Sequence, residues 1–285
     1  MSALAGAAGA GAAGGRAVRL VAAPPVRSVT PVLALREARR LLLHPFTLVG
    51  FAVYVVATVS TVVADQGPRS AFETVAMVQA FYPGMMLILS GTMLATRDLR
   101  AGSAEVLGPL PGRAEERVKA LLLAALGPAL VGLVLSGTLH AVYLGLDRYA
   151  AVPEGVPGLW HLLGGPVTLL GATTFGVMIG VWLPSRVTAV LGLVALIVYN
   201  LALDSRGEYR LLGMAVSWAE WGLYADNWAG VMDGSPALHV VYLLALCGMA
   251  ASAAWVRVAD RRTAPVATGL VSLAVAVTAG IGQLP

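Results

Sequence analysis

The sequence predicts an all-α membrane protein: a polytopic bundle of transmembrane helices with six core spans and a possible seventh. Of the 285 residues, 58% are hydrophobic and only 12% are charged. The mean hydropathy of +0.80 lies well outside the range of soluble globular domains. A helix needs roughly 20 mainly apolar residues to cross a bilayer core about 30 Å thick, and the chain supplies such runs repeatedly. The runs are continuously apolar, whereas transmembrane strands alternate over roughly ten residues, so helices are the better interpretation.

The apolar runs set the domain organisation. Five runs have the length of a full crossing: 46–64, 74–96, 120–146, 159–183 and 238–258. Two further runs, 187–203 and 266–282, are shorter and closer to the lower limit for a span. We therefore expect the following parts: an Ala/Gly-rich disordered tail at 1–30, a surface helix at 31–45, six core spans within 46–258, and a possible additional span at 266–282.

The distribution of basic residues predicts the orientation. With the N-terminus in the cytoplasm, fifteen of the nineteen Lys and Arg residues fall in cytoplasmic segments. The four exceptions are Arg69, Arg148, Arg206 and Arg210. An excess of Lys and Arg on the cytoplasmic side is typical of multi-pass proteins, so we expect a cytoplasmic-membrane protein with its N-terminus inside. The basic residues are spread over several loops, which argues against nucleic acid as a partner.

Several function classes lack the residues that they need. Every Asp, Glu, Lys and Arg can be placed in a loop or near a helix end, whereas ion-coupled pumps usually carry ionisable groups within their spans. No P-loop, H-E-x-x-H or G-x-S-x-G motif occurs, so we expect no enzyme and no ATP site on this chain. No cluster of His, Cys, Asp and Glu has the spacing of metal ligands.

The segment 31–45 is predicted to be an amphipathic helix on the inner membrane surface. Its basic residues share one face, namely Arg36, Arg39 and Arg40. Its apolar residues share another, namely Leu35, Ala38 and Leu42. Such a helix can lie in the interface with its apolar face in the membrane. The alternative is a simple basic anchor that only sets orientation.

A second cytoplasmic segment, 97–117, joins the second and third expected spans. Its apolar residues fall close to one helical face, namely Leu99, Val106, Leu107 and Leu110. A short helix with an apolar ridge and flanking charges can dock into a groove on a cytoplasmic partner. The alternative is a solvated connector.

Together these segments resemble the membrane subunit of a type-2 ABC exporter, an ABC-2-type permease. The matching residues are Glu37, Arg40 and Pro45 in the first segment and Glu105, Leu107 and Pro111 in the second. The resemblance implies that 31–45 is the connecting helix and that 97–117 contacts a separate ABC ATPase subunit, which would hold ATP and Mg. It also implies a dimer with a second permease copy or a paralogue. The implied ATPase-coupling residues are Leu99, Arg100, Glu105, Val106, Leu107 and Pro111, and Arg36, Glu37, Arg39 and Arg40 belong to the interfacial helix.

The resemblance further implies that the second and fifth spans line a translocation path. This nominates Gln79, Tyr82, Met86, Ser90, Met93, Tyr199 and Asn200. Met is otherwise common as gap-filling core, which is the alternative for that residue type. An uncharged path favours an apolar or amphipathic cargo. The external loop 204–237 carries Trp218, Trp221, Tyr224 and Trp228, which suit either the outer leaflet or an ordered extracellular cap.

Small residues within the spans predict close helix pairing. Gly176 and Gly180 form a G-x-x-x-G pair, which we expect to be used within the subunit. Two other functions stay open at this point: an ion-coupled secondary transporter, and a membrane scaffold that transports nothing.

Overall fold

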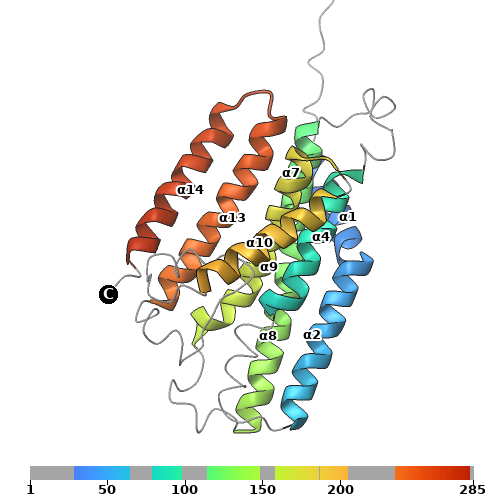
Figure 1. The fold of residues 1–285 in the computed structure, drawn as a ribbon, viewed down its shortest axis with the longest axis vertical. Helices are drawn as coiled ribbons and strands as arrows, with labels where there is room; N and C mark the ends of the chain where they lie inside the picture. Colours follow the sequence, from blue (N-terminus) through green and yellow to red (C-terminus); the bar gives the residue numbers. More distant parts are fainter. Residues whose placement is uncertain are drawn as a thin grey trace, which may run out of the picture.

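The computed structural model describes residues 29–64, 79–97, 114–147, 158–185, 187–204 and 235–282, and the elements within these ranges are all helical (Figure 1). In chain order they are α1 (Thr30–Leu42), α2 (Pro45–Ala64), the π-helical turn η1 (Ala80–Gly84), α4 (Met85–Ala95), α7 (Ala114–Ala124), α8 (Leu126–Gly145), α9 (Leu159–Trp182), α10 (Thr188–Asp204), α13 (Pro236–Val258) and α14 (Thr263–Gly282). The predicted all-α class is confirmed for these residues. Nearly all of the expected tail and of the expected external loop lies outside them.

Five helical stretches are long and apolar enough to cross a membrane. They are Pro45–Ala64, Ala114–Gly145, Leu159–Trp182, Ala237–Val258 and Thr263–Gly282. The runs expected at 74–96 and 187–203 contain shorter apolar helices, Tyr82–Ala95 and Thr188–Val198. The chain therefore has the helices of a multi-pass membrane protein.

Helix α9 is the centre of the bundle. It packs against α4, α8 and α13, and most of its residues are buried. By contrast, α2 and α14 expose long rows of Val and Leu, including Val56 and Val63 on α2 and Leu270 and Val271 on α14. These helices are apolar on every side, and such exposed surfaces suit lipid rather than water.

The backbones of α4 and α9 approach closely because glycines lie between them. A Cβ added at Gly176 would sit 2.5 Å from the carbonyl oxygen of Ile88, and one added at Gly180 would sit 2.8 Å from that of Thr92. The Thr92 hydroxyl donates a hydrogen bond to the carbonyl oxygen of Gly176 at 2.9 Å, across the two helices. The G-x-x-x-G pair is thus used within the subunit, as predicted.

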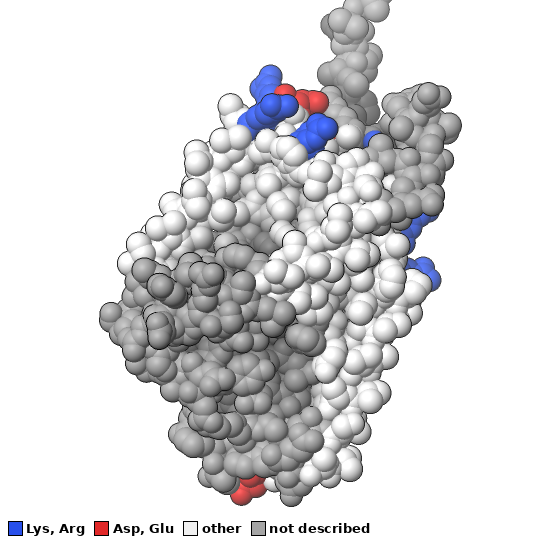
Figure 2. Space-filling model, viewed as in Figure 1, with Lys and Arg blue, Asp and Glu red and all other residues white. Residues whose placement is uncertain are grey.

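All nine Lys and Arg residues among those described lie at one end of the bundle, which we call the basic end. They are Arg36, Arg39, Arg40, Arg97, Arg117, Lys119, Arg257, Arg261 and Arg262. Helix α1, the end of α4, the start of α7 and the α13–α14 connection meet at this end. Figure 2 shows several of these side chains in blue at the upper end of the view.

Helix α14 forms an antiparallel hairpin with α13 (Figure 1). Small residues face one another along it, with Gly248 against Ser272 and Gly269 against Ser252. α14 begins at the basic end and is 20 residues long, three more than the apolar run 266–282 suggested.

The close approach of α4 and α9 gives a direct test of the packing. We expect Gly176→Ala to lower the free energy of unfolding by about 1–3 kcal/mol, because the new methyl group would meet backbone atoms of α4 that cannot move aside. Gly137→Ala is the matched control, since a Cβ there meets nothing within 4 Å. Thermal unfolding of the detergent-solubilised protein, followed by tryptophan fluorescence, measures both. Equal midpoints for the two variants would contradict the packing of α4 on α9.

Candidate functional site

Helix α1 presents two unlike faces. Its inner face is held against α7 and α8, where Leu41 is 2% exposed and Ala38 lies beside Gly127. Its outer face exposes Val32 together with the basic residues Arg36 and Arg39. Leu35 lies on the helical face predicted for it, with Ala38 and Leu42, but it is 76% exposed, whereas Ala38 and Leu42 lie beside Gly127 of α8.

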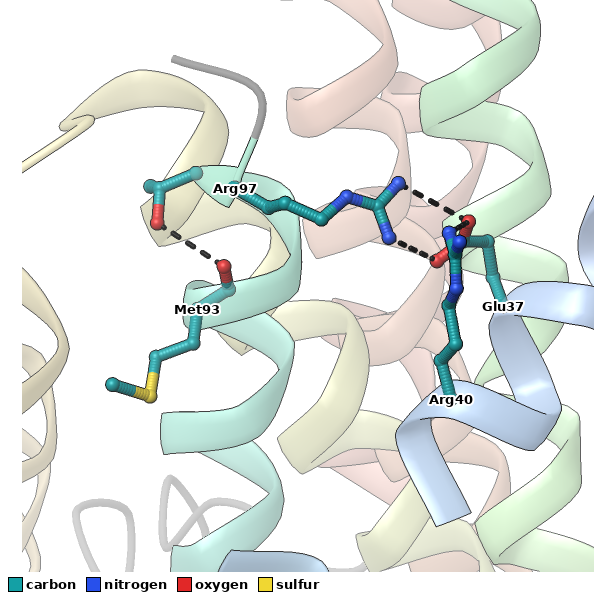
Figure 3. Close-up of polar contacts among 5 residues, drawn as sticks. Glu37, Arg40, Met93 and Arg97 are labelled. Carbon is teal, nitrogen blue, oxygen red and sulfur yellow. Dashed lines mark hydrogen bonds and ion pairs between the residues drawn. The ribbon is translucent and has the colours of Figure 1, made fainter. Parts of the chain in front are cut away.

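The carboxylate of Glu37 is the charged group on the inner face of α1, and it is bound by two guanidinium groups (Figure 3). Arg97 donates to both of its oxygens, from Nη1 to Oε2 at 3.0 Å and from Nη2 to Oε1 at 3.2 Å. Arg40, one turn along α1, donates from Nη1 to Oε1 at 2.7 Å. Two-pronged contacts of this kind are stronger than single ones and fix the geometry of the pair. We call these three residues the Glu37 cluster.

Burial makes the Glu37 cluster structurally demanding. The Glu37 side chain is 7% exposed, whereas those of Arg97 and Arg40 are 36% and 40% exposed. A carboxylate taken out of water is costly unless charged donors compensate, and here two donors do. The guanidinium groups keep part of their hydration, so the contact is less costly than a fully buried pair. The Glu37–Arg97 ion pair thus connects α1 to the end of the second expected span.

The residues at the end of α4 position Arg97 for this ion pair. Thr96 donates from its hydroxyl to the carbonyl oxygen of Thr92 at 2.9 Å and to that of Met93 at 3.4 Å, which satisfies carbonyl groups of the last turn. Arg97 follows directly, still helical, and its side chain crosses to α1 (Figure 3). Arg97 is also the first residue of the predicted coupling segment 97–117.

A second polar feature lies in the core of the bundle, at Gln79. This side chain is 0% exposed, and its Nε2 donates to the Gly132 carbonyl oxygen and to Ser136 Oγ, both at 2.8 Å. The hydroxyl of Tyr54 on α2 is 3.4 Å away. The Oε1 atom has no hydrogen-bond partner and fills the space left by two glycines, because a Cβ at Gly165 would sit 2.7 Å from it. Gln79 therefore links three helices and leaves one polar atom unsatisfied.

The other nominated residues whose side chains are described, Tyr82, Met86, Ser90 and Met93, differ in burial and in their neighbours. Ser90 is fully buried and its Oγ lies 2.9 Å from Thr47 Oγ1 on α2. Met86 packs beside Gly50 of α2, Met93 is half-buried, and Tyr82 is 38% exposed. In this conformation the polar members, Gln79 and Ser90, point into the subunit and Tyr82 points outward. Tyr199 and Asn200 belong to α10, but their side chains lie outside the described part of the structure.

The structure describes the residues on either side of the predicted coupling residues. Leu99, Arg100, Glu105, Val106, Leu107 and Pro111 all lie outside the described residues. The segment that contains them runs from Arg97, in the Glu37 cluster, to Ala114, where α7 begins. Residues 114–117 of the expected segment 97–117 are already the first turn of α7.

The sequence placed Glu37 and Arg40 together in the interfacial helix and gave Arg97 only as the start of the coupling segment, so the contact between them was not predicted. One signal was present: Glu37 lies one helical turn before Leu41, on the stripe that packs against the bundle. A carboxylate on such a stripe requires a cationic partner from another element. Among the described residues no group of three or more His, Cys, Asp or Glu is placed to hold a metal ion.

The Glu37 cluster predicts a measurable coupling energy. We expect Glu37→Ala and Arg97→Ala each to lower the free energy of unfolding by about 1–3 kcal/mol, less than for a fully buried pair because both arginines are partly hydrated. The double variant should cost clearly less than the sum of the two, since the contact between Glu37 and Arg97 can be lost only once. Arg36→Ala, on the exposed face of the same helix, is the control and should change stability by less than about 0.5 kcal/mol. Strictly additive effects in chemical denaturation would rule out the pairing.

Two polar features of the described bundle bear on the expected function, the Glu37 cluster at its basic end and the Gln79 amide in its core. The first joins α1 to the residue that opens the expected cytoplasmic segment, and the second joins three helices where a membrane interior is expected. Comparison with protein-family models, with curated proteins and with solved structures finds no match to this chain.

Proposed function

We propose that this chain is the membrane-spanning permease subunit of an ABC exporter, which moves an apolar or amphipathic cargo across the cytoplasmic membrane with ATP hydrolysed by a separate partner subunit. One observation carries the proposal: Glu37 of the surface helix is bound at 3.0 Å by Arg97, the residue from which the segment proposed to dock the ATPase begins. A push on that segment would reach the surface helix and the second span together. This is the arrangement that a permease without its own ATP site requires.

The proposed topology has seven crossings with the N-terminus in the cytoplasm. The basic end supports this orientation, because Lys and Arg are retained on the cytoplasmic side of multi-pass proteins. α2, α8, α10 and α14 run away from the basic end, and α4, α9 and α13 run toward it (Figure 1). The loop 204–237 and the end of the chain would then lie outside. The short helices of the second and fifth spans are part of this proposal, because each contains a described apolar helix.

The character of the spans supports an uncharged cargo. The described Asp, Glu, Lys and Arg residues lie in α1, near the ends of the spanning helices or in their connections, so the bundle interior presents amide, hydroxyl and thioether groups and the buried imidazole of His239 in the first turn of α13. A coupled ion or proton usually needs an ionisable group within the membrane. The exposed apolar faces of α2 and α10, which include Val53, Val56, Val190 and Val194, leave room for a second permease subunit beside lipid.

The topology can be tested with single cysteine probes in a Cys247→Ala background. We expect a membrane-impermeant maleimide to label Ser235→Cys and Gln283→Cys in intact cells, and to label Ser28→Cys only after the membrane is opened, because Lys and Arg hold the basic end inside. Cys247 is buried and must be removed so that only the probe reacts. Labelling of Ser28→Cys in intact cells would reverse the orientation. Protection of Gln283→Cys alone would place α14 on the surface rather than across the membrane.

The partner can be tested by copurification. We expect an ABC ATPase to purify with the wild-type chain and to be lost with Leu107→Asp, because an unpaired charge buried in a docking ridge costs far more than the contact itself. Ala101→Asp, which adds the same charge on the opposite face of the expected helix, is the matched control and should retain the partner. Glu105→Ala should weaken binding only mildly, since a partly exposed charge pair is typically worth under about 1 kcal/mol. If wild type brings down no ATPase, the scaffold or the secondary transporter becomes the better reading of the chain.

A further inference from the structure

The first turn of α7 is fastened to the far end of the chain through Glu115. The indole N–H of Trp255, in the last turn of α13, donates to Glu115 Oε1 at 2.8 Å. The backbone N–H of Asp260, in the α13–α14 connection, donates to Oε2 at 3.4 Å. Lys119, one turn along α7, binds Oε1 at 2.6 Å, and its ammonium group lies 4.4 Å from the centre of the Trp255 ring. One carboxylate therefore joins α7, α13 and the connection to α14.

These contacts differ in kind from an ordinary surface ion pair. The Glu115–Lys119 pair alone, at positions i and i+4 of one helix, would be worth only a few tenths of a kcal/mol. The indole N–H and the backbone N–H come from residues at least 140 positions away along the chain. The contacts therefore join two separate helices rather than two turns of one helix. The Lys119 ammonium over the Trp255 ring adds a cation–π contact to the same group. We call Glu115, Lys119 and Trp255 the α7–α13 clasp.

The α7–α13 clasp lies at one end of the segment proposed to dock the ATPase. The expected coupling segment joins the end of the second span at Arg97 to the start of α7 at Ala114. Arg97 is tied to α1 through Glu37, and Glu115, the second residue of α7, is tied to α13 through Trp255. Both ends of the segment are thus fastened to helices other than their own. A movement of the segment would therefore be transmitted to α1 at one end and to α13 at the other.

We propose that the α7–α13 clasp is a rigid joint through which movement of the coupling segment reaches the α13–α14 hairpin, with Glu115 as a positioning residue. The proposal rests on the function proposed above, because it takes the ATPase to act on the segment. α13 packs along α9, the central helix, so displacement of α13 reaches the bundle core directly. The clasp stays closed throughout the cycle, and α7 and α13 move together.

The experiment separates the joint from partner binding. In the purified complex of both subunits, Glu115→Ala should retain the ATPase in full yield but lower permease-stimulated ATP hydrolysis about fivefold. Glu115→Gln should fall between wild type and Glu115→Ala, because its single amide oxygen can still accept from the Trp255 indole N–H, whereas its NH2 group cannot accept from the Asp260 N–H. Glu116→Ala is the matched control: it removes a charge from the same helical turn, and with it the same interaction with the helix dipole.

A covalent cross-link in place of the Glu115–Asp260 contact tests the joint directly. Glu115→Cys combined with Asp260→Cys, in a Cys247→Ala background, should lose stimulation as Glu115→Ala does and regain it when the two cysteines are joined by a short bismaleimide. Amide hydrogen exchange at Asp260 should rise in Glu115→Ala and not in Glu116→Ala, which verifies the contact without any partner.

Each result has one meaning. Normal stimulation in Glu115→Ala, or stimulation that the cross-link abolishes rather than restores, overturns the rigid joint. Loss of the ATPase from Glu115→Ala would also overturn it, because the residue would then act in docking. If the wild-type chain binds no ATPase, the proposed function fails, and the exchange data alone then report on the contact.

Discussion

The direct contact between the backbones of α4 and α9 is the constraint on which the rest of the structure depends. Gly91, Gly176 and Gly180 leave no side chain between the two helices, and the Thr92 hydroxyl bridges the remaining space. A helix held this closely cannot slide along its neighbour without backbone collisions. This packing sets the position of α4. At the basic end it places Arg97 beside Glu37, and before the π-helical turn it places Gln79 beside α8.

The Gln79 amide and the Glu37 carboxylate each carry a cost that apolar residues would avoid. The Gln79 amide makes two good hydrogen bonds, yet its Oε1 is buried without a partner, and such an atom costs about 1–3 kcal/mol. The Glu37 carboxylate needs two guanidinium groups to be tolerated at 7% exposure. Polar groups at membrane depth are expensive and usually mark function. The segment that contains Gln79 and ends at Arg97, the partner of Glu37, is also the one that leads into the proposed docking segment.

Much of the fold could be predicted because a bilayer imposes a length on apolar runs. The runs at 46–64, 159–183 and 238–258 became α2, α9 and α13 with small changes at their ends, and the Gly176–Gly180 pair was correctly assigned to packing within the subunit. The inward direction of Gln79 and Ser90 could not be predicted. A helix that is apolar all round has almost no amphipathic signal, so the sequence does not say which side faces a neighbour. The Glu37–Arg97 pair joins positions 60 residues apart and depends on how far α4 extends, which no local pattern encodes.

Glu37 and Glu115, two of the carboxylates at the basic end, are held by different chemistry. Glu37 is bound by the side chains of Arg40 and Arg97, which are 40% and 36% exposed and keep part of their hydration. Glu115 is bound by Lys119 of its own helix, by the indole N–H of Trp255 on α13 and, at 3.4 Å, by the backbone N–H of Asp260 in the α13–α14 connection. A contact made only by partly hydrated side chains allows more relative motion of its two helices than one that includes a backbone N–H. Under the proposed function, the α1–α4 contact would therefore be the more adjustable joint of the basic end and the α7–α13 contact the more rigid one.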